Sequence, residues 1–220
     1  MKVSSGIPGL DELMGGGFED ASINLVSGKT GTGKSIFCAQ FLYNGAVKNN
    51  ERGLYLTTGE TIANIKRQSK KFGWDFDGLE KKGMVKVMEI EPFDIETLIE
   101  RITENIEAAK AKRVVIDSVS MFELYMHEPF KIRKSLFKVL QRLREMGKTV
   151  LLVAEVLEDS KGLSRFGVIE FMVDSVIILQ YLGIAKHKRS LMIRKMRMTD
   201  HSTDIHPFDI TPKGIVIRSV

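Results

Sequence analysis

The residues of this chain whose types and spacing most clearly predict chemistry are 28–35, GKTGTGKS. They fit G-x-x-x-x-G-K-[ST], the pattern of a phosphate-binding loop. Glycines let the backbone curl so that consecutive N–H groups point at phosphate oxygens. Lys34 brings a positive charge to the β- and γ-phosphates of ATP, and the Ser35 hydroxyl is a ligand for Mg²⁺. The stretch therefore predicts a site for a magnesium nucleotide.

The sequence on both sides of this loop has the context that the motif requires. Residues 21–27 are apolar enough for a buried strand, and 36–43 suit a helix packed on a sheet. The N-terminus of that helix adds a favourable partial charge for phosphate. The alternative is a glycine-rich turn with an incidental lysine. The residues predicted to contact ATP here are Gly28, Thr30, Gly31, Thr32, Gly33, Lys34, Ser35 and Ile36, and Lys34 is also a catalytic candidate.

A second chemical candidate is Asp117, which follows Arg113 and the three β-branched residues 114–116. Such a run predicts a central strand with a carboxylate at its C-terminal end, the edge where open α/β sheets bind ligands. There the aspartate would hold magnesium together with Ser35, directly or through water. The alternative is a strand that happens to end in Asp.

Composition limits the class of protein to which the chain can belong. Of 220 residues, 43% are hydrophobic and 28% are charged, which is ordinary for a soluble globular protein. The one cysteine, Cys38, excludes an internal disulfide and suits a reducing compartment. No run reaches the ~18 apolar residues that a membrane span needs, and residues 1–6 lack a signal-peptide core. We therefore expect a cytoplasmic protein, whose net charge of +5 permits a polyanionic partner without demanding one.

The elements that must position these residues follow from periodicity and turn signals. Helices are predicted near 6–14, 59–72, 95–111 and 130–146, and strands near 53–58, 84–89, 149–154, 174–181, 190–198, 205–210 and 215–218. Residues 159–171 read as a mobile loop. Alternating strands and helices followed only by strands predict an α/β fold, with a mainly parallel sheet flanked by helices and antiparallel hairpins at the C-terminus. The absence of a linker or repeat predicts one domain over 1–220.

Five stretches taken together resemble a RecA-like P-loop ATPase, and more specifically a single KaiC-type domain. They are 5–11 (SGIPGLD) with the glycines at 15–17, the phosphate loop, 72–75 (FGWD), 116–119 (IDSV), and 195–201 (KMRMTDH) with 207–211 behind it. They span nearly the whole chain in the family's order. Because the circadian-clock KaiC has two such domains in tandem, the chain resembles the short prokaryotic KaiC-like and RadA-related proteins.

The resemblance implies a homo-oligomer, usually a hexameric ring, with ATP between neighbouring subunits. Lys195 and Arg197 would then reach the phosphates of the adjacent protomer as catalytic residues, with Met196, Thr199 and His201 beside the nucleotide. The residues themselves agree in part, since Lys195 and Arg197 are two apart on a predicted strand and project from one face. The alternatives are a solvated basic strand face and, for His201, a surface or hydrogen-bonded histidine.

One departure from the family's pattern concerns hydrolysis. KaiC-type domains typically carry two consecutive glutamates after the second strand, and the first is taken to activate water. Alignment on 72–74 places Gly59 at the first position and Glu60 at the second. A glycine cannot deprotonate water, so hydrolysis falls to Glu60 or is slow. The alternative role for Glu60 is favourable negative charge at a helix N-terminus.

Two other functions stay open from sequence alone. A single-stranded-DNA-binding recombination accessory protein would use residues 159–171, with Lys161 and Arg165, and the basic stretch 186–189. Single-strand binders combine basic grooves with aromatic stacking surfaces, and this loop offers only Phe166 and Phe171. A regulatory scaffold would instead bind ATP without significant hydrolysis, and Gly59 is its best argument.

Overall fold

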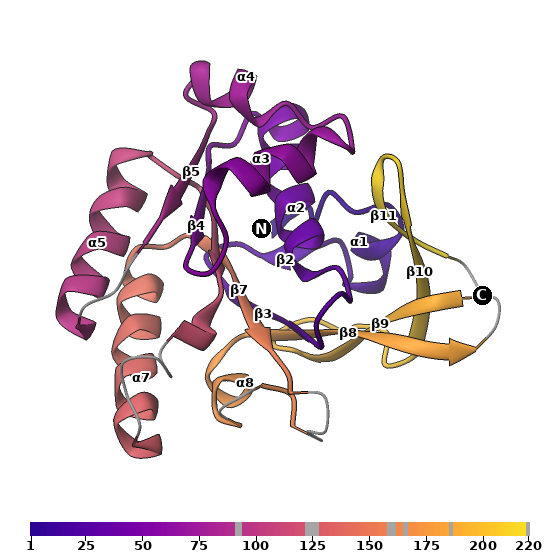
Figure 1. Ribbon diagram of the computed structural model, residues 1–220. Helices are drawn as coiled ribbons and strands as arrows, with labels where there is room; N and C mark the ends of the chain where they lie inside the picture. The colour runs from indigo at the N-terminus through magenta and orange to yellow at the C-terminus, as the bar shows by residue number, and fades with distance from the viewer. Residues whose placement is uncertain (91–93, 122–127, 158–161, 165–166, 185–186, 219–220) are drawn as a thin grey trace.

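The structure is a computed structural model and describes residues 1–90, 94–121, 128–157, 162–164, 167–184 and 187–218. In this part of the chain a nine-stranded sheet has helices on both faces (Figure 1). The sheet order is β11-β10-β9-β8-β3-β7-β6-β4-β5. A separate antiparallel pair consists of β1 (Lys2–Val3) and β2 (Phe18–Glu19), and α1 (Leu10–Leu13) lies between them in the sequence.

The parallel half of the sheet contains the predicted alternation of strands and helices. Its elements are β3 (Ile23–Gly28), α2 (Lys34–Asn49), β4 (Gly53–Thr57), α3 (Ile62–Lys70), α4 (Phe76–Lys81), β5 (Val85–Glu89), α5 (Ile95–Ala108), β6 (Arg113–Asp117), a 3-10 turn at Val119–Met121, α7 (Pro129–Glu145) and β7 (Thr149–Glu155). Parallel pairing joins β3 to β7, β7 to β6, β6 to β4 and β4 to β5. The carboxyl ends of these strands therefore meet at one edge.

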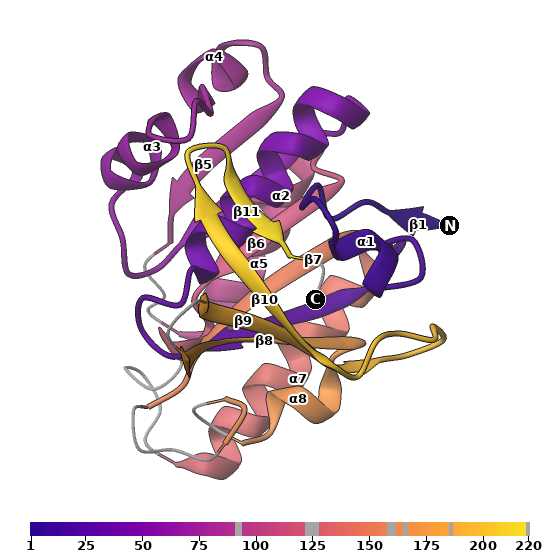
Figure 2. The same cartoon turned by 90° about the vertical axis from the view of Figure 1, so that its right-hand side faces the viewer.

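The C-terminal part extends this sheet by antiparallel pairing. It consists of α8 (Ile169–Met172), β8 (Ser175–Ile184), β9 (His187–Met196), β10 (Ile205–Thr211) and β11 (Gly214–Ile217). Strand β8 runs parallel to β3, and β9, β10 and β11 follow as antiparallel neighbours. The last strands turn toward α2 (Figure 2), where Gln40 exchanges two hydrogen bonds with the backbone of Ile215, at 2.6 and 3.0 Å. The predicted α/β architecture is confirmed.

Two apolar layers hold the helices against the sheet. On one face, α1, α2, α3 and α4 pack over side chains such as Val26, Val115 and Val153. On the other, α5, α7 and α8 pack over side chains such as Leu25, Val114 and Leu152. Successive residues of one strand serve opposite layers because side chains alternate across a strand. Strands buried on both faces read as continuous apolar runs, which is why the sequence predicts them well.

The structure differs from the prediction at three places. The first helix covers only Leu10–Leu13, because Gly6 and Gly9 have φ of +70° and +82°, which a helix cannot contain. The predicted loop 159–171 ends in α8, so its last residues are helical. Helix α4 is not predicted from the sequence, although Asp75 caps it by accepting a hydrogen bond from Gly78 N.

A buried cation, Arg113 at the start of β6, joins several of these elements. The Arg113 guanidinium, 1% exposed, donates to Glu51 at 2.6 Å and to the carbonyls of Ser4 and Phe41. It also lies 4.5 Å from the centre of the Phe41 ring. These contacts tie the N-terminal segment and α2 to the start of β6. The Arg113 side chain has room for these contacts because residue 45 is glycine, since a Cβ there would lie 2.4 Å from that side chain.

We expect Gly45→Ala to destabilise the protein, although alanine is normally the better helix residue by ~1 kcal/mol. The added methyl would push Arg113 from its partners, and overpacking costs about 1–3 kcal/mol. Urea unfolding of the variant and of Lys48→Ala, an exposed position in the same helix, measures the effect. The control should stay within about 0.5 kcal/mol of the unmodified protein. A more stable Gly45→Ala would contradict this account.

Candidate nucleotide-binding site

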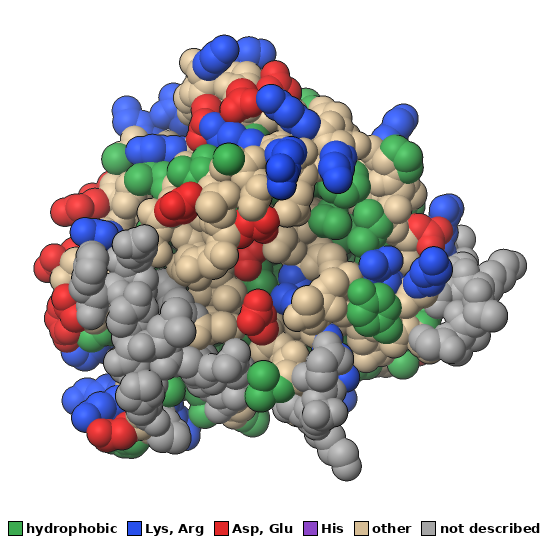
Figure 3. All heavy atoms as spheres, viewed as in Figure 1, with side chains coloured by type: hydrophobic (Ala, Val, Ile, Leu, Met, Phe, Trp, Pro, Cys, Tyr) green, Lys and Arg blue, Asp and Glu red, His purple; other side chains and the backbone are tan. Residues whose placement is uncertain are grey.

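The phosphate loop, Asp117 and Glu60 come together at the carboxyl edge of the parallel strands. Gly28, the last residue of β3, pairs in register with Glu155 in β7. Asp117, the last residue of β6, pairs with Val153 in β7 and with Thr57 in β4. Strand β7 therefore lies between the loop strand and the aspartate strand. Figure 3 shows this face of the molecule, where acidic side chains gather in the middle and basic ones around α3 and α4.

The phosphate loop needs glycine for a contact that the motif alone does not show. A Cβ at Gly28 would lie 2.2 Å from the carbonyl oxygen of Leu179 in β8 and 2.9 Å from Thr32 Oγ1. Thr32 is buried and donates a hydrogen bond to the Lys29 carbonyl at 2.8 Å. The loop is thus packed between its own backbone and β8. Its outer residues Thr30 and Gly31 are exposed.

Lys34 begins α2 and lies against the loop. Its ammonium donates hydrogen bonds to the carbonyls of Gly28 and Lys29, at 2.8 and 2.9 Å, and the residue is 8% exposed. Burial lowers the pKa of Lys34, and the nearby carboxylates of Glu155 and Asp117 partly offset that shift. A cation held by two carbonyls at the N-terminus of a helix is suited to binding an anion.

Two side chains converge on one carboxylate oxygen at the end of β6. Ser35 Oγ donates to Asp117 Oδ2 at 2.8 Å, and Tyr55 Oη donates to the same oxygen at 2.6 Å. Tyr55 is 1% exposed, and burial followed by the charge of Asp117 raises its pKa well above the usual value. The tyrosine therefore acts as a donor that orients the carboxylate. A hydroxyl and a carboxylate side by side are the oxygen ligands that Mg²⁺ prefers.

Glu60 lies just before α3 and is half-buried. Its backbone N–H donates to Thr57 Oγ1 at 3.1 Å, and its carboxylate accepts from Gln68 Nε2 at 2.7 Å. Helix α3 is capped by Thr61, which accepts from Asn64 N, so Glu60 is not the capping residue. Beside it, Gly59 is exposed, and a Cβ there would meet nothing within 4 Å.

Lys195 and Arg197 lie near the amino end of β3, at the opposite end of that strand from their own phosphate loop. Met196, between them, pairs with Ser175, which pairs with Asn24 at the start of β3. Strand β3 rises about 13 Å from Asn24 to Gly28, at about 3.3 Å per residue. The two cations therefore sit near the beginning of the strand whose end forms the loop.

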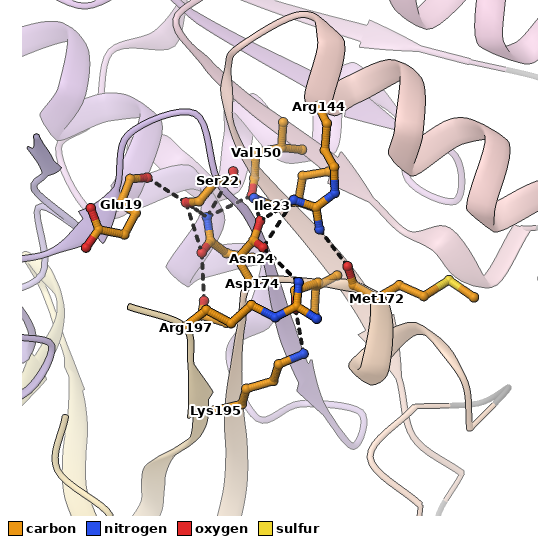
Figure 4. A network of polar contacts seen from close by, with 12 residues as sticks. Glu19, Ser22, Ile23, Asn24, Arg144, Val150, Met172, Asp174, Lys195 and Arg197 are labelled. Carbon is orange, nitrogen blue, oxygen red and sulfur yellow. Dashed lines mark hydrogen bonds and ion pairs between the residues drawn. The ribbon is translucent and has the colours of Figure 1, made fainter. Parts of the chain in front are cut away.

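Both side chains contact the end of α8 (Figure 4). Lys195 Nζ donates to the carbonyls of Glu170 and Val173, at 3.0 and 2.7 Å. Arg197 donates to the Phe171 carbonyl at 3.2 Å and to Asp174 at 3.3 Å. Burial, followed by the neighbouring charge of Arg197, lowers the pKa of Lys195. The pair thus lies on one face, as the two-residue spacing predicts.

The remaining residues of this stretch have local partners. Thr199 donates to Glu19 at 2.8 Å and accepts from Lys2. His201 Nδ1 lies 2.9 Å from the Ser202 carbonyl, to which the ring donates in the tautomer that carries the proton there. Met196 is buried in the apolar layer. None of these three contacts the phosphate loop of its own chain in the contacts of the described residues.

Sequence reasoning missed contacts of two residues at the site. Arg189, part of the basic stretch in the DNA hypothesis, donates to the Gly31 carbonyl at 3.2 Å and lies 5.2 Å from the centre of the Tyr181 ring. The Tyr55 hydroxyl is hidden in an apolar strand run, where tyrosine reads as core. Of the other DNA candidates, Phe171 is 71% exposed. Lys161, Arg165, Phe166 and Lys186 lie outside the described residues.

Within the described residues, no helix combines the length and apolar character that crossing a membrane requires.

Comparison with known proteins identifies relatives of this chain. The UPF0273 protein of Thermotoga maritima is 38% identical over 234 residues, covering 98% of this chain and 95% of that protein. The circadian clock oscillator protein KaiC of Synechococcus elongatus is 37% identical over 228 residues, covering 98% of this chain. The chain spans only 44% of that clock protein.

A solved structure agrees with these sequence matches. The crystal structure of a KaiC-like protein from Pyrococcus horikoshii matches with a TM-score of 0.92 and 40% identity, covering 100% of this chain and 99% of that one. The family model described as "ATPase: KaiC" matches residues 3–219. With the phosphate loop, the strand-end aspartate and the KMRMTDH stretch placed as described, the chain belongs to the KaiC family of ATPases.

Proposed function

We propose that this protein binds ATP with Mg²⁺ and hydrolyses it slowly in a homo-oligomeric ring, where Lys195 and Arg197 of one protomer complete the site of the next. The observation that carries this proposal is the position of the two cations. They lie near the start of β3 and contact α8, whereas the phosphate loop follows the end of β3. A position at the opposite end of β3 from their own phosphate loop supports a role at the nucleotide of a neighbouring chain. A cytoplasmic location suits the buried free thiol of Cys38.

The loop supplies the binding part of this function. Backbone N–H groups of Gly31, Thr32 and Gly33 would face phosphate oxygens, and the Lys34 ammonium would exchange its carbonyl contacts for the β- and γ-phosphates. The oxygens of Ser35 and Asp117 would hold Mg²⁺, which neutralises phosphate charge when bound. Tyr55 and Ser35 donate to one oxygen of Asp117 and so fix the orientation of that carboxylate. Ile36 lies in the first turn of α2, next to the bound phosphates.

The catalytic part rests on Glu60 and on the neighbouring chain. Glu60 is the carboxylate just beyond β4, and its contact with Gln68 leaves one oxygen to accept a proton from an attacking water. Arg197 and Lys195 would stabilise charge that develops on the phosphoryl group in the transition state. Met196, Thr199 and His201 would lie beside the same nucleotide. With glycine at position 59, we expect turnover to be slow.

Lys34→Ala should weaken ATP binding by at least ~2 kcal/mol, or roughly 30-fold in Kd, because the loop loses its charged partner for phosphate. Calorimetry with ATP and Mg²⁺ measures the change, with Lys48→Ala as the control on the exposed side of the same helix. Unchanged affinity in a folded Lys34→Ala protein would show that the loop is not the nucleotide site.

Gly59→Glu should raise the rate of ATP hydrolysis by at least ~10-fold, since a positioned general base contributes about 10²–10⁴-fold. A Cβ at Gly59 would meet nothing within 4 Å, so the backbone there has room for a side chain. Phosphate release under saturating ATP measures the rate. Gly59→Gln has the same length without a base and serves as the control. Equal rates for the two variants would indicate that Glu60 alone, or no carboxylate, activates water.

Arg197→Ala should lower turnover by at least ~10-fold while leaving nucleotide affinity nearly unchanged, because the guanidinium acts mainly on the transition state. Mixing it with Lys34→Ala tests whether the site is shared. In a mixed ring, an Arg197→Ala loop can face the intact cations of a Lys34→Ala protomer, so activity should partly return. If mixed rings form without recovery, or if Arg197→Ala is fully active, the cations do not act between protomers.

A further inference from the structure

The cations that we assign to the neighbouring site share one acidic partner. Asp174 lies between α8 and β8, and its side chain is 13% exposed. Oδ1 accepts hydrogen bonds from Arg197 at 3.3 Å and from Arg144 at 3.1 Å. Oδ2 accepts from Arg144 at 2.8 Å and from the backbone N–H of Ile23 at 2.9 Å (Figure 4). One carboxylate thus contacts two guanidinium groups and the start of β3.

The backbone of Asp174 is held as firmly as its side chain. Its N–H donates to the Ile23 carbonyl at 2.7 Å, and its carbonyl accepts from Arg197 N at 2.9 Å. The residue is therefore bonded to the first residue of β3 and to the residue that follows β9. Through Arg144 it is also bonded to the last turn of α7. Its position is fixed by three elements before any second protomer is present.

Asp174 lies among three positively charged side chains, and its carboxylate offsets their mutual repulsion. Arg144, Lys195 and Arg197 all donate to backbone carbonyls between Glu170 and Val173. Three cations at one turn repel one another unless a carboxylate lies among them. The other acid near them is Glu170, and its carboxylate accepts a hydrogen bond from Ser164. Asp174 is the acid that bonds directly to two of the three cations.

We propose that Asp174 is a positioning residue for catalysis between protomers: it sets the base of the Arg197 side chain and keeps Arg197 and Lys195 on one face for the neighbour's nucleotide. This inference rests on the proposed function. A long side chain that is already oriented loses less freedom when it binds phosphate. The Arg197 side chain is 47% exposed while its guanidinium contacts Asp174, so a second chain can reach it in the orientation that the carboxylate holds.

The contacts of Asp174 also suggest an alternative role within its own chain. Because Asp174 bonds to Ile23, it could act within its own chain by fixing β3 and hence the phosphate loop at the end of that strand. The two roles predict different partners. Positioning of Arg197 affects the site of the next protomer, whereas support of β3 affects the site of the same protomer. A mixing experiment separates them.

The first measurement uses Asp174→Asn, which keeps an oxygen to accept from Ile23 N and removes the negative charge. We expect at least a ~10-fold lower kcat with a less than ~2-fold change in ATP affinity, the signature of a group that acts in the transition state. Asp174→Glu, which restores the charge, should recover most of the activity. Arg142→Gln is the control, since Arg142 is exposed on α7 and pairs with Glu145.

The second measurement mixes Asp174→Asn with Lys34→Ala and compares the recovery with that of the Arg197→Ala and Lys34→Ala pair. Partial recovery in both mixtures supports the proposal, because the Lys34→Ala protomers then supply intact cations to intact loops. Recovery in the Arg197 mixture alone overturns it and assigns Asp174 to its own chain. Recovery in neither mixture overturns the shared site itself. If Asp174→Asn does not fold, Asp174→Ser, which also offers an acceptor to Ile23, takes its place in both measurements.

Discussion

The parallel pairing of β3 with β7 and of β7 with β6 is the constraint on which the site depends. It brings the loop after Gly28 and the carboxylate of Asp117 to one edge, although they are far apart in the chain. The hydrogen bond from Ser35 to Asp117, at 2.8 Å, follows from that register. A shift by one residue would turn the Asp117 side chain to the other face of the sheet. The apolar layers on both faces are what prevent such a shift.

The sequence predicts much of this arrangement because its strongest signals are local. The phosphate loop is one uninterrupted stretch, and Asp117 ends a run of β-branched residues that favours a buried strand. Helix α4 escapes prediction because it is short and lacks a strong apolar period. The hydrogen bonds of Tyr55 and Asp174 escape it because their partners lie in distant elements. Such contacts exist only once the sheet order is known.

Packing requires glycine at position 28 but not at position 59, although both residues belong to the same site. At Gly28 the backbone of β8 approaches so closely that no side chain fits, so the residue is fixed by packing. At Gly59 the surroundings are open, so packing does not explain the residue. The backbone at this position therefore has room for a Cβ, at the place where the resemblance to KaiC-type domains predicts a glutamate. In the proposed function, the glycine affects the chemistry of the site because it supplies no base.

The contacts of Lys195 with the α8 carbonyls have a consequence for assembly. In a separate protomer these donors are already satisfied, so joining a ring exchanges hydrogen bonds instead of adding them. Exchanges of this kind are nearly balanced in free energy. In rings of the kind proposed, the negative charge of the bound nucleotide then tips the balance. In that proposal, assembly of the ring would therefore depend on bound ATP.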